Sequence, residues 1–282
     1  MKKITRRSFM AAAGLTVAAL ALTACGGSSS TASSAAASSV ASSAAASSEA
    51  ASAAATELTT VEAGKLTMAT NAAFPPYEMT TDAGEFEGID VETAQAIADK
   101  LGLELQIDDM DFDAALLSVQ QGKADIVMAG VTVTDERKAV MDFSDSYATG
   151  IQSIIVPEGS DIASPDDLAG KKIGTQRGTT GYIYCSDDFG DENVVAYDNG
   201  LTAVQALNNG QVDAVVIDKA PAKEFVAANP GLVILDTSYA EEDYAIGMAK
   251  GSSLEDAINA ALEELKADGT LQSIVDKYIT AE

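Results

Sequence analysis

Short apolar runs alternate with stretches of helical periodicity from about residue 65 onward. The run at 125–128 (DIVM) lies between Lys123 and Gly130, and a similar run at 65–70 (KLTMAT) precedes it, so both predict buried strands. Between these runs, apolar residues recur every three or four positions, at Val91, Ala94, Ile97, Ala98 and Leu101. This spacing predicts a helix that Asp90 caps and Gly102 closes.

The same reasoning extends along the chain. Phe112 opens a second predicted helix, which Gly122 closes. Further strands are predicted at 103–107, 170–175, 232–235 and 244–248, and further helices at 201–207, 254–265 and 271–279. Strands that alternate with helices of this length predict an α/β fold, with mostly parallel sheets that helices cover on both faces.

A possible internal repeat suggests two similar α/β units. Residues 121–128 (QGKADIVM) match residues 209–216 (NGQVDAVV) in pattern, each being a helix end, a glycine, an aspartate and an apolar strand. Such junctions also recur by chance in α/β proteins, so the alternative of no true repeat stays open. In this register Gly130 and Asp218 are equivalent positions just beyond a strand, where open α/β sheets bind ligands.

The segment after the strand at 125–128 contains an unusual cation. Thr134 is placed to cap a short helix, and Asp135 and Glu136 suit its first turn. Arg137 in that same turn opposes the helix dipole, at a cost of roughly 0.3–1 kcal/mol. Two interpretations follow, either a receptor for a carboxylate, which a guanidinium grips in bidentate fashion, or an exposed arginine paired with a nearby acid.

Two loops add candidate binding groups. Residues 71–77 (NAAFPPY) follow the first strand, and their two prolines exclude a helix or a central strand. Residues 178–181 (GTTG) form a predicted tight turn that opens a helix, and such a turn points backbone N–H groups at an anion.

The N-terminal residues have the pattern of an export signal. Lys2, Lys3, Arg6 and Arg7 precede an apolar stretch at 9–22 that is too short for an ordinary transmembrane helix. Residues 22–25 (LTAC) resemble the lipobox of bacterial lipoproteins, so residues 1–24 are the predicted signal peptide and Cys25 the lipidated residue. Residues 5–10 (TRRSFM) also resemble a twin-arginine signal, and the choice between the two export routes stays open.

Residues 25–60 are almost entirely Ser, Ala, Gly and Thr and predict a flexible tether, because they offer hardly any apolar surface to bury. The remainder, from about residue 65, is long enough for one large or two medium domains.

Composition excludes several functions. Without the leader's four basic residues the chain has 13 basic and 43 acidic side chains, a net charge of −30, which disfavours a nucleic acid partner. The chain contains no histidine, so histidine-based catalysis and imidazole metal sites are excluded, and we expect no cofactor and no metal. Once Cys25 carries lipid, Cys185 has no partner for an intrachain disulfide and is expected to be inert.

Five separated motifs together resemble one family. Residues 70–77 (TNAAFPPY), 130–137 (GVTVTDER), 142–145 (DFSD) and 178–181 (GTTG), with Asp218, resemble the polar amino acid-binding proteins of ABC importers, the family 3 extracellular solute-binding proteins. The resemblance covers nearly all of 65–279, in order and with similar spacing.

The resemblance implies the type II fold of periplasmic binding proteins, which is α/β with two lobes that close on a ligand. Each lobe has a mostly parallel sheet flanked by helices, and two hinge strands join the lobes. The implied limits are 65–146 and 248–282 for the large lobe, 152–241 for the small lobe, and 147–151 and 242–247 for the hinges.

The resemblance also implies a role for each site residue. Arg137 would bind the α-carboxylate of an amino acid, with help from the Thr132 region and from N–H groups near Thr179 and Thr180. Asp218 and the Gly130 carbonyl would hold the α-ammonium. Phe74 and Phe112 would sandwich the side chain. On the sequence alone these two phenylalanines are equally core aromatics, and Asp218 is equally a helix N-cap before Pro221.

Selectivity for the ligand's side chain is the least determined feature. Asn71 stands where some relatives carry an aspartate, and Gln176 stands where a relative can carry a lysine. Both departures leave glutamine, arginine and other polar ligands open. Arg177 would favour an acidic ligand if it faced the site, and otherwise it is exposed to solvent.

The implied function is that of a substrate-binding lipoprotein of an amino acid ABC importer. It would be a monomer with no catalytic activity, held by lipid at the outer face of the cytoplasmic membrane, with a permease and an ATPase as partners. Two alternatives remain, a periplasmic enzyme similar to cyclohexadienyl dehydratase, which would need a carboxylic acid as general acid, and an amino acid sensor without transport.

Overall fold

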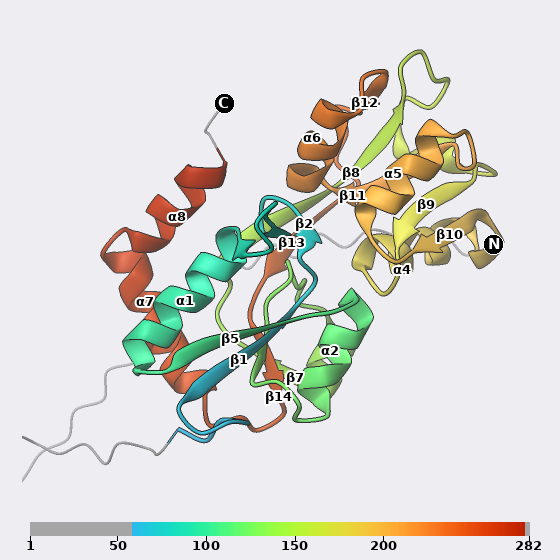
Figure 1. The fold of residues 1–282 in the computed structure, drawn as a ribbon. Helices are drawn as coiled ribbons and strands as arrows, with labels where there is room; N and C mark the ends of the chain where they lie inside the picture. Colours follow the sequence, from blue (N-terminus) through green and yellow to red (C-terminus); the bar gives the residue numbers. More distant parts are fainter. Residues whose placement is uncertain (1–57, 280–282) are drawn as a thin grey trace, which may run out of the picture. The chain divides into compact units, whose positions relative to one another are not determined.

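The computed structural model describes residues 58–279. The predicted signal peptide, Cys25 and the predicted tether up to residue 57 lie outside the described residues. Helices flank two main sheets, which confirms the α/β fold class (Figure 1).

The first sheet has the order β5-β1-β6-β14-β7. Its strands are β1 (Lys65–Thr70), β5 (Glu104–Asp109), β6 (Ile126–Val127), β7 (Met141–Phe143) and β14 (Gly247–Ala249). β1 pairs in parallel with β5 and β6, and β14 is antiparallel to both β6 and β7. Only β14 therefore runs against the other strands of this sheet, in agreement with the expected mostly parallel arrangement.

Alternate residues of β1 face opposite layers, as the pleat of a strand requires. Leu66 and Met68 join the core that includes residues of α1 (Ile89–Leu101), α7 (Glu255–Ala267) and α8 (Thr270–Tyr278). Ala69 joins a separate cluster with residues of α2 (Phe112–Gln120). Figure 1 shows α1, α7 and α8 together on one side of this sheet and α2 on the other.

The second sheet has the order β10-β9-β11-β8-β12, and β13 also pairs with β8. Its strands are β8 (Ala148–Pro157), β9 (Ile173–Gln176), β10 (Val194–Tyr197), β11 (Ala214–Asp218), β12 (Leu232–Ile234) and β13 (Ala240–Tyr244). β9 pairs in parallel with β10 and β11, whereas β8 is antiparallel to β11, β12 and β13. This sheet, too, contains a single reversed strand.

β11 also divides its side chains between two layers. Val215 and Ile217 share a core with residues of α5 (Gly200–Asn208) and α6 (Lys219–Ala228). Ala214 and Val216 share another with Cys185, which lies in α4 (Thr180–Phe189). The last residue of β11 is Asp218, so the strand delivers this carboxylate at the carboxyl end of the sheet.

The chain passes twice between the sheets. It leaves β7 at residue 143 and enters β8 at 148, and it returns from β13 at 244 to β14 at 247. The prediction of one strand at 244–248 is wrong, because two residues between β13 and β14 carry the chain from one sheet to the other. The lobe and hinge limits stay a prediction, although the two expected hinge segments pair with each other in the antiparallel register of β8 and β13.

The structure confirms one of the predicted helix N-caps and contradicts another. Thr134 accepts a hydrogen bond from the Arg137 N–H at 3.2 Å and so caps α3 (Asp135–Val140), as expected. The prediction that Asp90 caps α1 is wrong, because Gly88 occupies the N-cap position and Asp90 is fully buried inside the first turn.

The remaining elements are short. They are β2 (Ala73–Phe74), β3 (Glu78–Thr80) and β4 (Phe86–Glu87), which form a three-stranded sheet, and the 3-10 helices η1 (Pro165–Leu168) and η2 (Asp191–Asn193).

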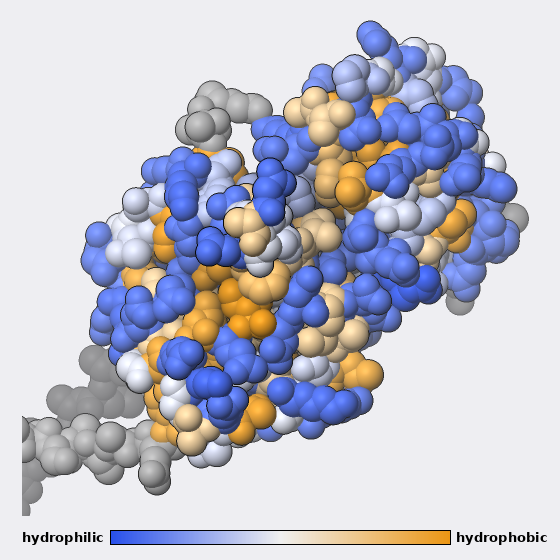
Figure 2. All heavy atoms as spheres, in the orientation of Figure 1, coloured by the Kyte–Doolittle hydropathy of each residue, from blue (hydrophilic) through white to orange (hydrophobic). Residues whose placement is uncertain are grey.

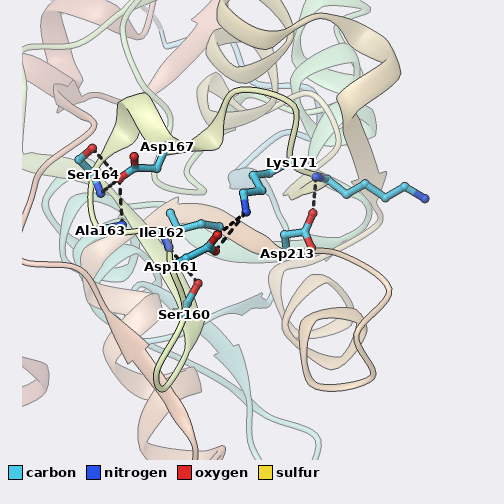
Figure 3. A network of polar contacts seen from close by, with 9 residues as sticks. Ser160, Asp161, Ile162, Ala163, Ser164, Asp167, Lys171 and Asp213 are labelled. Atoms are coloured by element: carbon cyan, nitrogen blue, oxygen red, sulfur yellow. Dashed lines mark hydrogen bonds and ion pairs between the residues drawn. The ribbon is translucent and has the colours of Figure 1, made fainter.

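The loop between β8 and β9 shows how the acidic surface is stabilised (Figure 3). The Asp167 carboxylate accepts the Ser164 N–H at 2.9 Å and closes a capping box on η1. Lys171 pairs with Asp161 at 3.0 Å, and Asp213 accepts the N–H of the next residue, Lys172, at 2.7 Å. Hydrophilic residues cover most of the face drawn in Figure 2, as the acidic composition predicts.

Candidate functional site

A cavity brings together all ten residues that the sequence indicates as ligand contacts. Its lining comprises Asn71, Phe74, Glu78, Phe112, Ala129, Gly130, Thr132, Arg137, Gln176, Thr179, Thr180 and Asp218. Glu78 and Ala129 are the two lining residues that the sequence analysis did not indicate. The lining residues with numbers from 71 to 137 come from segments around the first sheet, and those from 176 to 218 come from segments around the second. The role of these residues as ligand contacts stays a prediction.

Arg137 is held by two backbone carbonyls. Its guanidinium donates to the Thr132 carbonyl at 2.8 Å and to the Gly178 carbonyl at 3.1 Å, and it lies 5.4 Å from the centre of the Phe112 ring. The side chain is 8% exposed, so the alternative of a solvent-exposed arginine is wrong. Burial lowers the pKa of Arg137, and the negative charge of Glu242 opposes this shift. A guanidinium has five N–H donors, so the two carbonyls leave donors for a carboxylate.

Thr179 and Thr180 form the start of α4. The Thr179 hydroxyl accepts the Tyr182 N–H at 3.3 Å and donates to the Gln176 carbonyl at 2.8 Å, which caps the helix. The first N–H groups of a helix have no partner within the helix, and Thr180, the first residue of α4, lines the cavity. This end of α4 can therefore receive an anion beside Arg137.

Asp218 ends β11 and occupies the N-cap position of α6, but its side chain makes no capping bond. Instead its carboxylate accepts from Gln152 Nε2 at 2.8 Å and from the hydroxyl of Tyr244. Burial raises the pKa of Asp218 to about 7, and the two hydrogen bonds oppose that shift. Burial disfavours the charged form of such a carboxylate, and a cation that binds next to it stabilises that charged form.

Glu242 is a buried carboxylate that the sequence analysis placed only in a hinge segment. Its Oε2 atom accepts from the Thr180 hydroxyl at 2.9 Å, from Gln152 Nε2 at 2.9 Å and from the Thr132 hydroxyl at 3.2 Å. A signal for it exists in the sequence, because Ala240, Glu242 and Tyr244 alternate with polar residues and so share one strand face.

Glu78 and Asp90 form a second buried acidic pair. Asp90 Oδ2 accepts the Gly130 N–H at 2.9 Å and the Tyr147 hydroxyl at 2.7 Å. The first of these bonds holds the backbone of the Gly130 loop in place. Burial raises the pKa of Asp90 to about 6. Burial, and then the charge of Asp90, raise the pKa of Glu78 well above its usual range.

The two amide residues contact each other across the cavity. Gln176 Nε2 donates to Asn71 Oδ1 at 2.9 Å, and Asn71 Nδ2 donates to the Met110 carbonyl at 2.8 Å. Arg177 points elsewhere, since its side chain is 53% exposed and lies 3.7 Å from the Asp198 carboxylate. It is absent from the cavity lining, which leaves the option of an acidic ligand without support from Arg177.

Two aromatic rings complete the walls. Phe74 and Phe112 are both buried and both line the cavity, so they are core residues and cavity residues at once. The Phe74 ring lies against Gly130, where an added Cβ would come within 3.0 Å of the ring. Gly130 also has a positive φ of 55°, and this position therefore suits glycine for two reasons.

Other chemistry finds little support in the part of the chain that the structure describes. There, no group of three or more Cys, Asp or Glu side chains is arranged to hold a metal ion. Cys185 is fully buried, and burial raises the pKa of its thiol to about 12, which keeps it protonated and unreactive. Between residues 58 and 279, no helix is both long and apolar enough to cross a membrane.

Comparison with known proteins gives the family. The sequence profile of the bacterial extracellular solute-binding proteins, family 3, matches residues 66–281. The chain belongs to this family. Among family 3 relatives, it is 33% identical over 226 residues to the L-cystine-binding protein TcyJ of Escherichia coli strain K12, covering 78% of this chain and 85% of TcyJ. It is 34% identical over 228 residues to the arginine-binding extracellular protein ArtP of Bacillus subtilis strain 168, covering 77% and 87%.

Solved structures of similar proteins agree with the family 3 fold. An ancestral arginine-binding protein bound to glutamine superposes with a TM-score of 0.74 at 42% identity, covering 78% of this chain and all of that protein. The arginine-, lysine-, histidine-binding protein ArtJ of Geobacillus stearothermophilus superposes with a TM-score of 0.74 at 34% identity, covering 77% and 96%. These similarities confirm the predicted family and fold class.

Proposed function

We propose that this protein is the substrate-binding component of an amino acid ABC importer and captures a polar L-α-amino acid in the cavity. Arg137 binds the α-carboxylate, together with the N–H groups at the start of α4. Asp218 and the Gly130 carbonyl bind the α-ammonium. Phe74 and Phe112 enclose the side chain.

The single observation that carries this proposal is the placement of one buried guanidinium and one buried carboxylate on different sheets around one cavity. Arg137 follows a strand of the first sheet, and Asp218 ends a strand of the second. A zwitterion has a fixed separation of charge, so it satisfies both groups together only when the two sheets are close. Ligand binding then favours the closed arrangement through its higher affinity for that state.

The side chain of the ligand is polar and carries no obligatory positive charge. Asn71 and Gln176 offer amide donors and acceptors instead of a charged partner. Glutamine and arginine both fit this description, and the names of the relatives include proteins that bind each of these two amino acids.

The proposed location and partners rest on the N-terminal sequence and on the family. Lipid on Cys25 holds the mature protein at the outer face of the cytoplasmic membrane, at the cell surface or in the periplasm. The protein acts as a monomer that delivers its ligand to a permease, which an ATPase drives. Replacing the lipidated residue, Cys25→Ala, should release the protein from membranes, and continued membrane association of this variant would reject the lipobox assignment.

A thermal-shift screen tests the function directly. The full chain is purified in detergent, unfolded and refolded to remove bound ligand, and melted in the presence of each common L-amino acid and of prephenate. A ligand at about 100 times its Kd adds roughly 2.7 kcal/mol to the free energy of unfolding. For a domain of this size the melting temperature should rise by about 5–10 °C with one or a few polar amino acids.

Two outcomes would contradict the proposal. No shift with any amino acid would exclude this class of ligand. A shift with prephenate alone would favour the dehydratase-like enzyme, whose general acid would then be sought among the buried carboxyl groups with raised pKa values. Asp218 and Glu78 are the two such groups that line the cavity.

A further inference from the structure

Three donors from three elements converge on one oxygen of Glu242. Thr180 is the first residue of α4, Gln152 lies in β8, and Thr132 follows β6 of the other sheet. Their bonds to Glu242 Oε2 are 2.9, 2.9 and 3.2 Å long. The hydroxyl oxygens of Thr132 and Thr180 are themselves only 3.4 Å apart. Glu242 is therefore bonded to two cavity residues, one in the segment that follows β6 of the first sheet and one at the start of the helix that follows β9 of the second.

The position of Glu242 in β13 explains why its side chain points inward. Glu241 and Asp243, its neighbours in the strand, are exposed, whereas Glu242 is 6% exposed. The register pairs Glu242 with Gly150 of β8, and β13 is the strand that leads the chain back to the first sheet. A carboxylate at this point lies where the two sheets are connected.

Burying a carboxylate costs free energy unless its charge and its hydrogen bonds are compensated. The compensation here comes from the three donors and from the positive charge of Arg137, since Glu242 is the main group opposing the fall in the Arg137 pKa. Tyr184 of α4 also faces this carboxylate, whose negative charge, after burial, raises the pKa of the Tyr184 hydroxyl. Asp218 lies on the far side of Gln152 and shares its amide.

We propose that Glu242 is a positioning residue that links Thr132, which follows β6, to Thr180, which begins α4, and so stabilises the closed cavity. Glu242 does not line the cavity and acts through the two threonines. Its effect on affinity rests on the proposed amino acid binding. Because a hydroxyl has one hydrogen, a threonine that donates to Glu242 does not donate to a ligand, and the ligand carboxylate depends on Arg137 and on backbone N–H groups.

Glu242→Ala and Glu241→Ala form a matched pair of variants. The two glutamates are adjacent in β13, with one buried and the other exposed. The Kd of the amino acid found in the screen is measured by calorimetry, and the decrease in radius of gyration on ligand addition is measured by X-ray scattering. Loss of hydrogen bonds to a charged acceptor should weaken binding roughly 10- to 100-fold in Glu242→Ala and reduce the decrease in radius. Glu241→Ala should bind within about twofold of the unaltered protein, since surface changes away from a site have small effects.

Two further variants separate positioning from general stability. Glu242→Gln keeps an acceptor oxygen for the threonine hydroxyls and should recover part of the affinity. Thr180→Val removes one donor while keeping the shape, and the double variant Glu242→Ala/Thr180→Val should lose less affinity than the two single losses multiplied together. Affinity equal to that of the unaltered protein in Glu242→Ala, or fully multiplicative losses in the cycle, would overturn the proposal.

A measurement without ligand distinguishes this inference from the proposed function. The N–H of Val133 donates to the Asp243 carbonyl at 3.0 Å, and that of Ala245 donates to the Val131 carbonyl at 3.1 Å, so both report on the contact between β13 and the Thr132 segment. Their hydrogen exchange should be faster in Glu242→Ala and unchanged in Glu241→Ala. If no amino acid binds the unaltered protein, the proposed function fails. The exchange measurement still tests whether Glu242 holds the Thr132 segment in place. Equal exchange rates in the two variants would reject the proposed positioning role of Glu242.

Discussion

Two groups of residues, in the cavity and directly behind its wall, differ in how their contacts are built. The first contains the charged residues Arg137, Asp218 and Glu242, each buried and each bonded to at least two partners. The second is the amide pair Asn71–Gln176, joined by one side-chain bond of 2.9 Å. Both groups join segments around the first sheet to segments around the second.

Under the proposed function, we expect this difference to separate recognition of the amino acid backbone from recognition of its side chain. Every α-amino acid presents the same carboxylate and ammonium, and fixed buried charges suit an invariant pair of partners because they need not reorganise. Amides both donate and accept, so the same pair can match several side chains. We therefore expect the charged group to determine overall affinity and the amide pair to determine the order of preference among ligands.

The largest expected effect is that of Arg137→Ala. Removing the guanidinium leaves the ligand carboxylate buried without its counter-charge, which should cost about 3–5 kcal/mol of binding free energy for every amino acid ligand. Calorimetric titration measures the loss. Arg177→Ala is the matched control, since that arginine is exposed and absent from the cavity lining. Normal binding by the Arg137 variant would show that the carboxylate is held elsewhere.

Asp218→Asn should cost about 2–3 kcal/mol of binding free energy, because the amide keeps the shape but loses the charge that faces the ammonium. The unaltered protein should also release protons on binding. The pKa of Asp218 is raised to about 7 without ligand, and an adjacent ammonium lowers it. Affinity should thus fall as pH drops below about 7.

Calorimetry in buffers of different ionisation enthalpy measures that proton release. The release should be absent in Asp218→Asn. If the variant released as many protons as the unaltered protein, the ammonium would not be bound at Asp218.

Asn71→Asp tests the amide pair and should change selectivity more than overall affinity. A carboxylate at this position should favour a cationic side chain such as that of arginine over glutamine by about 1–3 kcal/mol. The ratio of the two Kd values measures the change. Gln176→Lys should shift the preference in the opposite direction, because a lysine repels a cationic side chain. Equal shifts for all ligands in either variant would remove the distinction between the two groups.

The sequence was sufficient to predict the charged group in part. By local rules Arg137 is unexpected in the first turn of its predicted helix, and Asp218 closes an apolar strand in a repeated pattern, so both stand out. The helix α3 has only six residues, so Arg137 also belongs to its last turn. Glu242 did not stand out, because EED in a polar stretch resembles ordinary surface charge until strand alternation places its middle residue inward. The bond partners of Glu242 are 90 and more residues away in two cases and come from tertiary structure alone.

The fold was predictable to a similar degree. Periodicity located β1, β5, β6 and most of the helices, because each buries one face, but it did not predict β8, the ten-residue strand of the second sheet, or β10. It failed at 244–248, where continuous apolar character hid the change from one sheet to the other. It also failed at Asp90, a polar residue at a helix start that serves Gly130 and Tyr147 instead of the helix end. In both places a long-range contact overrides the local rule.

The smallest expected effect concerns stability and tests the acidic pair behind the charged group. Burial raises the pKa of Glu78 in the folded state above its unfolded value, so the folded protein binds the extra proton. Its contribution to stability is therefore complete below about pH 4.5 and is lost as pH rises toward the folded pKa, by at most about 1.4 kcal/mol per pH unit. Glu78→Gln removes this titration, so the stability of the variant relative to the unaltered protein should increase between pH 5 and pH 8.

Urea unfolding without ligand at the two pH values measures the change, and Glu241→Gln on the surface is the control. The same variant also sharpens the comparison between the two groups. If Glu78 holds a proton, the neutral glutamine replaces a neutral acid and ligand affinity should change little, whereas a Glu78 that acts as an anion for the ligand would lose affinity for cationic amino acids. Unchanged affinity with an altered pH dependence of stability would indicate that Glu78 stabilises Asp90 and the Gly130 loop. The ammonium would then be bound by Asp218 and not by Glu78.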